Sequence, residues 1–392
     1  MRTGAARGCI GNFHEAWFYS SDAEFLALIV PFVAEGLTAG EPVVIGYDSR
    51  KCDLIRAALP WADAVTYIVD TSLYATPASA IEAYRRQFDR HLADGAGQIR
   101  IAGDVPHEGN GGRFDGWDRY ESAVNVVWQD YPVWSRCLYD ASTVPDDVRD
   151  VVQRTHRRLV TPDGAASASP RFEEVTEFTA LPPASDPLEA TAPTVELINP
   201  SAKRTRRRVE EVAHGRIGAA ALDELLFALS EAVINAQLYG PPPTTVRVWT
   251  GQDRIVVHVR DPGPGPANHL TGLVPAPDGS SGAGLGLWLS HQLTNIDIAL
   301  VNADGFTVRL RAGRLPSRAA SSSDETLFGA GTPNGARPSR GTVHAMDGDR
   351  SSFCDRIGAA GLVPLDSRRW SDVPREQRCP DCELLMDLYP RG

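Results

Sequence analysis

Cysteine is scarce in this sequence, and its distribution excludes a disulfide framework. Only six cysteines occur among 392 residues. Cys9, Cys52 and Cys137 are scattered, and the other three fall within roughly the last forty residues. Small secreted domains held by disulfides instead space their cysteines densely along the whole chain. The pattern favours a cytoplasmic protein.

Long apolar runs and an excess of positive charge are also missing. No run of about eighteen apolar residues occurs, as a transmembrane helix would need; the nearest stretch, residues 25–33, is interrupted by Pro31. Residues 1–12 lack the apolar centre of a signal peptide. Acidic residues outnumber basic ones by 50 to 39, giving a net charge of −11. We therefore expect no membrane segment and no direct nucleic-acid partner, since phosphate binding needs clustered cations.

The chain is long enough for two or three domains, and changes in composition mark their boundaries. Stretches rich in Pro, Ala and Ser, or in Ser, Gly and Arg, separate segments with regular apolar patterns. The predicted division is an α/β domain at 13–162, a linker at 163–194, an α+β domain at 195–313, a disordered linker at 314–341 and a small tail at 342–392.

The first domain alternates strand-like and helix-like segments. Strands are predicted at 15–19, 41–46, 65–69, 99–103 and 133–139, and helices at 22–38, 51–59, 77–93, 117–130 and 145–159. This alternation implies a mainly parallel sheet covered by helices. A further short strand is predicted in the linker at 172–178.

Three motifs of the first domain resemble the DcmR-type sensory domain called MEDS. They are His14-Glu-Ala-Trp-Phe-Tyr, the run from Phe32 to Gly40 followed by Glu-Pro-Val, and Arg154-Thr-His156. The resemblance implies a RecA-like parallel sheet without its ATP loop, which senses small molecules or partners. His14, His91, His107 and His156 are candidate ligand groups, although each taken singly is better interpreted as a structural or surface histidine.

His156 also lies in a segment similar to the phosphoacceptor box of histidine kinases. In that box an acidic residue follows the histidine, and a proline comes five positions on. Here Arg157 follows, and Pro162 is one place late. An atypical histidine kinase is therefore the weaker alternative for this chain.

Residues 222–289 carry three short motifs in one order. Glu231 and Asn235 stand four apart on a predicted helix, so they point the same way. Asp261 ends a predicted strand and enters a loop with Gly263 and Gly265. A glycine-rich loop then opens an apolar helix, and its glycines are Gly282, Gly284 and Gly286. Backbone amides at a helix start favour phosphate oxygens.

In this order the three motifs resemble the Bergerat-type ATPase domain of histidine kinases, gyrase, Hsp90 and anti-sigma serine kinases. The resemblance implies an ATP-binding α+β sandwich. Hairpins predicted at 245–260 and 296–311 indicate a mixed sheet backed by helices in this domain. The resemblance also implies that Asn235 holds Mg²⁺ and that Glu231 acts as general base or orients the acceptor. It further implies that Asp261 recognises adenine by a hydrogen bond and that Gly263 and Gly265 line the base pocket. The phosphates would be bound by the loop that contains Gly282, Gly284 and Gly286.

The lid of this domain is short, since about twenty residues separate Asp261 from Gly282. That length resembles the anti-sigma serine kinases more than the histidine kinases. We expect a protein serine/threonine kinase that acts on an anti-anti-sigma partner or binds a sigma factor, with an input on the first domain. The alternative is a non-catalytic switch gated by ATP or a ligand. A homodimer is the form that such domains often take.

Basic residues open the first helix of this domain. They are Lys203, Arg204, Arg206, Arg207 and Arg208. A solvated helix face is the stronger interpretation, and a docking patch for an acidic partner is the alternative.

The tail carries the ligand types of a structural zinc site. His344, Cys354, Cys379 and Cys382 form a Cys₃His set, which fits a zinc-ribbon-like module binding Zn²⁺. A redox dithiol of Cys379 and Cys382 and an unligated tail are the alternatives. A metal or redox sensor with the tail as its input is a third function hypothesis.

Overall fold

The computed structural model describes residues 2–59, 62–68, 74–160, 166–178, 180–181, 183, 185–268, 270–275, 285–302 and 304–314. Gly282, Gly284 and the whole tail with His344, Cys354, Cys379 and Cys382 lie outside these residues. The predictions made on them, and on the linker at 314–341, stay predictions. Within the described residues, no helix is both long enough and apolar enough to cross a bilayer.

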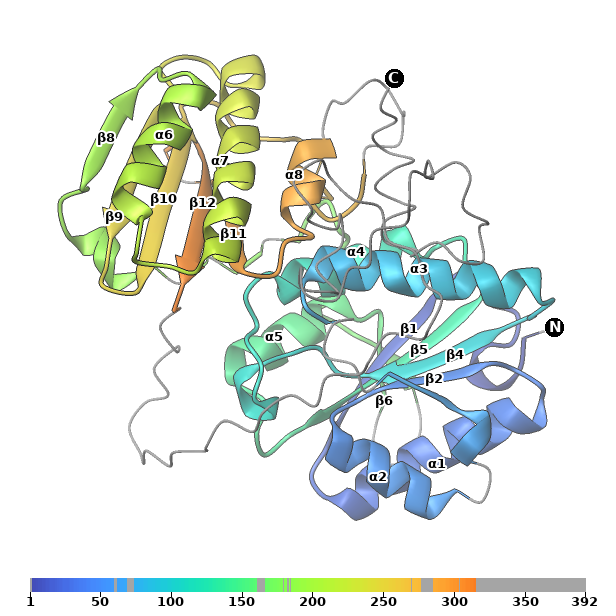
Figure 1. Cartoon of the computed structure of the whole chain (residues 1–392). Coiled ribbons are helices and arrows are strands. Elements are labelled where there is room, and N and C mark those ends of the chain that lie inside the picture. The colour runs from blue at the N-terminus through green and yellow to red at the C-terminus, as the bar shows by residue number, and fades with distance from the viewer. Residues whose placement is uncertain are drawn as a thin grey trace, which may run out of the picture. The chain divides into compact units, whose positions relative to one another are not determined.

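The first domain is a seven-stranded sheet with helices on both faces (Figure 1). Its elements are β1 (Phe13–Tyr19), α1 (Asp22–Thr38), β2 (Val43–Gly46), α2 (Ser49–Ala58), β3 (Thr66–Tyr67), α3 (Pro77–Ala93), β4 (Ile99–Gly103), α4 (Trp117–Val127), β5 (Val133–Asp140), α5 (Asp146–Thr155), β6 (Arg158–Val160) and β7 (Ala166–Ala168). The strand order is β3-β2-β4-β5-β1-β6-β7, and only the β6–β7 pair is antiparallel. The predicted parallel α/β architecture is confirmed.

Two apolar cores lie on the two faces of this sheet. Side chains of α1 and α2, such as Phe25 and Ile55, pack in one core. Side chains of α3, α4 and α5, such as Phe88 and Val151, pack in the other. The helices begin where side chains cap them: Ser21 accepts from the amide of Glu24, and Thr76 forms a capping box with Ser79. Because both faces are covered, the strands are apolar along most of their length.

Two predictions about the end of this domain are wrong. The helix predicted at 145–159 ends at Thr155, because residues 158–160 form β6 and pair with Glu15 and Ala16 of β1. Residues 172–178 form no strand. Their backbone closes into turns, with the Phe178 amide bonded to the Glu174 carbonyl at 2.9 Å, and the added strand is β7 instead.

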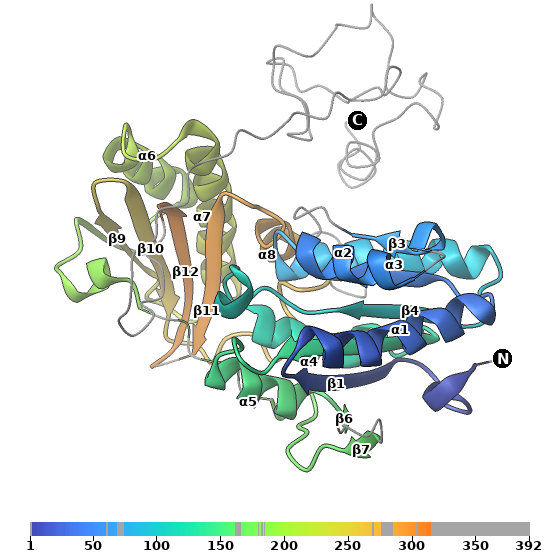
Figure 2. The same cartoon turned by 90° about the horizontal axis from the view of Figure 1, so that it is seen from below.

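The second domain is a five-stranded sheet with helices packed against it. Its elements are β8 (Val195–Ile198), α6 (Ala202–Ala213), α7 (Ala219–Tyr239), β9 (Thr245–Thr250), β10 (Arg254–Asp261), α8 (Leu285–Ser290), β11 (Ile296–Asn302) and β12 (Phe306–Gly313). The order is β11-β12-β10-β9-β8. Figure 2 shows the strands side by side with α6 and α7 packed along them, and the apolar residues of both helices join those of the strands in one core.

The mixed sheet expected for this domain is not found among the described residues. Every pairing there is antiparallel. Tight connections make two of these strand pairs antiparallel hairpins. Strand β9 turns into β10 around Gly251, and β11 turns into β12 around Asp304 and Gly305. Asp304 and Gly305 have positive φ angles of 51° and 114°. The α+β architecture itself is confirmed.

Candidate nucleotide-binding site

Helix α7 presents two polar side chains at the edge of its buried face. Its 21 residues are rich in Ala and Leu, which favour helix, and one face is buried in the core. Glu231 and Asn235 lie one turn apart beside that face, and both are half-buried. Among the described residues the Asn235 amide makes no hydrogen bond, so it is free to bind a ligand.

Asp261 lies at the end of β10, directly beside the end of α7. The Asp261 side chain is 5% exposed, and its Oδ1 accepts a hydrogen bond from the Gly263 amide at 2.8 Å. A Cβ added to Gly240, the C-cap residue of α7, would stand 2.3 Å from Asp261 Cγ. Within the described part of the chain, Oδ2 of Asp261 has no hydrogen-bond partner. One carboxylate oxygen is therefore fixed and the other can accept from a ligand.

The two glycines after Asp261 let their loop pack closely against neighbouring side chains. Gly265 has a φ of 75°, and a Cβ there would lie 2.5 Å from Phe306 Cδ2. A Cβ on Gly263 would lie 2.7 Å from Asp261 Oδ1 and 2.8 Å from Pro241 Cδ. Both positions require glycine for steric reasons, and Gly265 also for its backbone conformation.

Gly286, in the first turn of α8, packs against Glu231. A Cβ at Gly286 would lie only 1.8 Å from Glu231 Oε2. Burial raises the pKa of Glu231 above its usual value. The glycine thus lets the helix that follows the glycine-rich loop approach the acidic side chain of α7.

The structure therefore joins the sequence-predicted residues in two contacts. Glu231 meets Gly286 at one point, and Asp261 meets Gly263 at another, with α7 running between them. Gly240 was missed in the sequence. A glycine placed directly after the last residue of a long helix pattern, before Pro241, was the signal that could have found it.

Comparison with known families agrees with this geometry. Residues 13–157 match the family described as MEDS: MEthanogen/methylotroph, DcmR Sensory domain. Residues 199–312 match the Histidine kinase-like ATPase domain. The chain contains both domains. Both predicted resemblances are thereby confirmed, and the histidine kinase-like ATPase family implies binding of ATP and Mg²⁺.

A solved structure and the curated proteins add little to this result. The chain is similar to the histidine kinase domain of the E. coli osmosensor EnvZ, solved by NMR, with 19% identity over 35% of this chain and 98% of that one. The TM-score is 0.19, so this likeness carries no weight here. No curated protein matches the chain.

The candidate histidines of the MEDS domain fall into two groups. His14 and His156 lie against each other, with ring centroids 3.9 Å apart, and both are buried. His91 is half-buried on α3, and His107 accepts from the Gly109 amide at 3.1 Å. Because His156 is 0% exposed, a kinase domain cannot reach its imidazole in this fold, which disfavours it as a phosphoacceptor.

Proposed function

We propose that this chain is a signalling protein of the anti-sigma type, whose ATPase domain binds Mg-ATP and phosphorylates a serine or threonine of a protein partner. The MEDS domain is its input. A sensory domain joined to a histidine kinase-like ATPase domain supports a signalling ATPase or kinase. The observation that carries the proposal is the contact of Glu231 with Gly286, because it puts a carboxylate beside the helix that follows the glycine-rich loop.

Each residue of the site has a role in this proposal. Asp261 Oδ2 would accept from the adenine amine, and Gly263 and Gly265 would line the base. Asn235 would contribute an oxygen to Mg²⁺, a cation that takes few protein ligands and keeps several waters. Bound ATP supplies the phosphoryl group, with Gly282 and Gly284 expected along its phosphates. Glu231 would act as general base and take the proton of the acceptor hydroxyl, while positioning and charge neutralisation would supply the rest of catalysis.

The proposed partner is an anti-anti-sigma protein or a sigma factor. Lys203, Arg204 and Arg206 are exposed on α6, and within the described residues they form no salt bridge. Arg207 and Arg208 instead reach Glu211 at 3.4 and 2.8 Å. The three unpaired cations supply a surface that complements an acidic partner and accelerates its association.

Calorimetric titration of Mg-ATP into the full-length protein tests the nucleotide site. We expect saturable binding that Asp261→Asn and Asn235→Ala each weaken at least about tenfold. The matched control is Asp304→Asn, an exposed turn residue with a positive φ that asparagine tolerates well. Folded wild-type protein that binds no ATP would overturn the proposal.

Glu231→Gln separates a kinase from a switch. With a purified partner, the kinase loses phosphate transfer in this variant and keeps ATP binding, because the amide has the same size but cannot take a proton. The alternative, a non-catalytic switch, is supported if the wild type binds ATP and changes its affinity for the partner without labelling it.

A further inference from the structure

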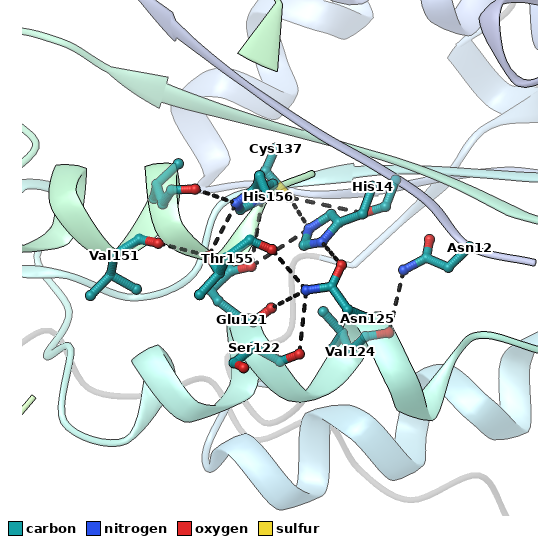
Figure 3. A network of polar contacts seen from close by, with 12 residues as sticks. Asn12, His14, Glu121, Ser122, Val124, Asn125, Cys137, Val151, Thr155 and His156 are labelled. Carbon is teal, nitrogen blue, oxygen red and sulfur yellow. Dashed lines mark hydrogen bonds and ion pairs between the residues drawn. The ribbon is translucent and has the colours of Figure 1, made fainter. Parts of the chain in front are cut away.

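Four potential metal ligands meet inside the MEDS domain, away from the nucleotide site. His14 comes from β1, Cys137 from β5, Glu121 from α4, and His156 follows the last residue of α5. In the parallel β1–β5 register, His14 is opposite Ser135 and Ala16 is opposite Cys137, so His14 and Cys137 share one face of the sheet. Figure 3 shows the side chains converging between this face and the two helices.

The nitrogen–oxygen distances in this cluster fit metal coordination better than hydrogen bonding, while the sulfur–nitrogen distance fits either. His14 Nε2 lies 3.5 Å from Cys137 Sγ and 3.6 Å from Glu121 Oε2, and His156 Nε2 lies 3.7 Å from the same oxygen. The two nitrogen–oxygen separations exceed normal hydrogen bonds. Ligands about 2.0–2.3 Å from a tetrahedral Zn²⁺ are about 3.3–3.8 Å from each other. All four ligand atoms lie within 4.8 Å of one another.

Both imidazoles are held so that Nε2 offers a lone pair to the centre. The Asn125 amide nitrogen donates to the carbonyl of Thr155 at 2.7 Å, so its oxygen faces His14 Nδ1 at 3.2 Å and makes that nitrogen the donor. His156 Nδ1 donates in turn to the Val152 carbonyl at 2.9 Å. Partners of this kind orient the histidines of known metal sites.

An unsatisfied atom points to a missing partner at the same place. His156 is 0% exposed, yet its Nε2 has no hydrogen bond. Glu121 Oε1 already accepts from Tyr139 at 2.6 Å, which leaves Oε2 for the centre. A buried polar atom without a partner is costly, and a cation between these groups would satisfy all of them.

We propose that His14, Glu121, Cys137 and His156 bind a divalent transition-metal ion, with Zn²⁺ the best match to two nitrogens, one oxygen and one sulfur. A cavity of about 30 Å³ is lined by His14, Glu121 and Cys137. It is large enough for a water-sized molecule, which gives the site room for an exchangeable ligand. This site is independent of the function proposed for the ATPase domain.

Cobalt binding to the full-length chain tests the site. The starting protein carries Cys354→Ser, Cys379→Ser and Cys382→Ser, which removes the thiols of the tail motif as ligands. After chelation and reduction, we expect it to take up about one equivalent of Co²⁺, with the visible bands of tetrahedral cobalt and a near-ultraviolet thiolate band. Zn²⁺ should displace the cobalt.

Single variants then assign the ligands. Adding Cys137→Ser should abolish the thiolate band and weaken cobalt binding at least about tenfold. Cys52→Ser is the control, because Cys52 is a buried free cysteine that contributes to the core formed by α1 and α2. Glu121→Gln should weaken binding and keep the band. A folded starting protein that takes up no cobalt, or a band that survives Cys137→Ser, overturns the proposal.

Discussion

The polar side chains of the metal cluster in the MEDS domain face one another, whereas two polar groups of the nucleotide site have no partner among the described residues. His14, Glu121 and His156 are 4%, 1% and 0% exposed. Glu231 and Asn235 are half-buried, and Asp261 keeps one carboxylate oxygen without a partner in the described part of the chain. Buried side chains that surround one point suit a ligand as small as a metal ion. Polar groups without a protein partner suit a larger ligand that supplies its own hydrogen-bonding groups, such as a nucleotide.

The largest effect on Mg-ATP affinity should come from a side chain added beside Asp261. Gly240→Ala places a Cβ 2.3 Å from Asp261 Cγ, at backbone angles that alanine accepts. Since Asp261 is buried and cannot swing away, we expect Mg-ATP affinity to fall at least about tenfold. Calorimetry measures this. Gly218→Ala is the control at the other end of α7, where a new Cβ meets nothing within 4 Å. Equal losses in both variants would show that the helix, rather than Asp261, is responsible.

A smaller effect, on the local stability of α6, should follow from removing the side chain that caps this helix. Ser201 caps α6 by accepting from the Arg204 amide at 3.3 Å. We expect Ser201→Ala to cost about 1 kcal/mol in local stability and to speed hydrogen exchange of α6 amides, with Mg-ATP affinity unchanged. Ser230→Ala, which removes only a bond to the Leu226 carbonyl within α7, should leave α6 exchange as in the wild type.

The smallest effect should appear in the MEDS domain, as a change in how steeply its free energy of unfolding depends on pH. Burial lowers the pKa of His107 from its ordinary 6.5. Below that pH the unfolded chain takes up a proton that the folded domain does not, so the free energy of unfolding falls as the pH drops. Asparagine can accept from the Gly109 amide and does not titrate, so His107→Asn should flatten this fall in urea unfolding.

Local patterns predicted the elements well. Apolar spacing placed the helices at 22–38 and 77–93 and the strand at 99–103 at the bounds of α1, α3 and β4. Local rules failed where a long-range pairing decided the outcome. Residues 158–160 continue a helical pattern in the sequence, but β1 offers them an unpaired edge, and they extend the sheet instead.

The residues of the nucleotide site could be grouped from the sequence, whereas those of the metal cluster could not. Glu231 and Asn235 share a helix, and Asp261 ends a neighbouring strand, so short-range spacing was enough to group them. The metal cluster draws one residue from each of four elements. From the sequence, His14 and His156 were named only singly, Cys137 was named only as a scattered cysteine, and Glu121 was not named. Strand register and the packing of α4 on α5 bring them together, and neither can be read from spacing.

His156 occupies a particular place along the chain. It is the C-cap of α5, and within two residues the backbone enters β6, from which the polypeptide continues toward the ATPase domain. A covalent backbone has no slack over two residues. An ion held by His156 would therefore also anchor the short connection between α5 and β6, the strand that pairs with β1.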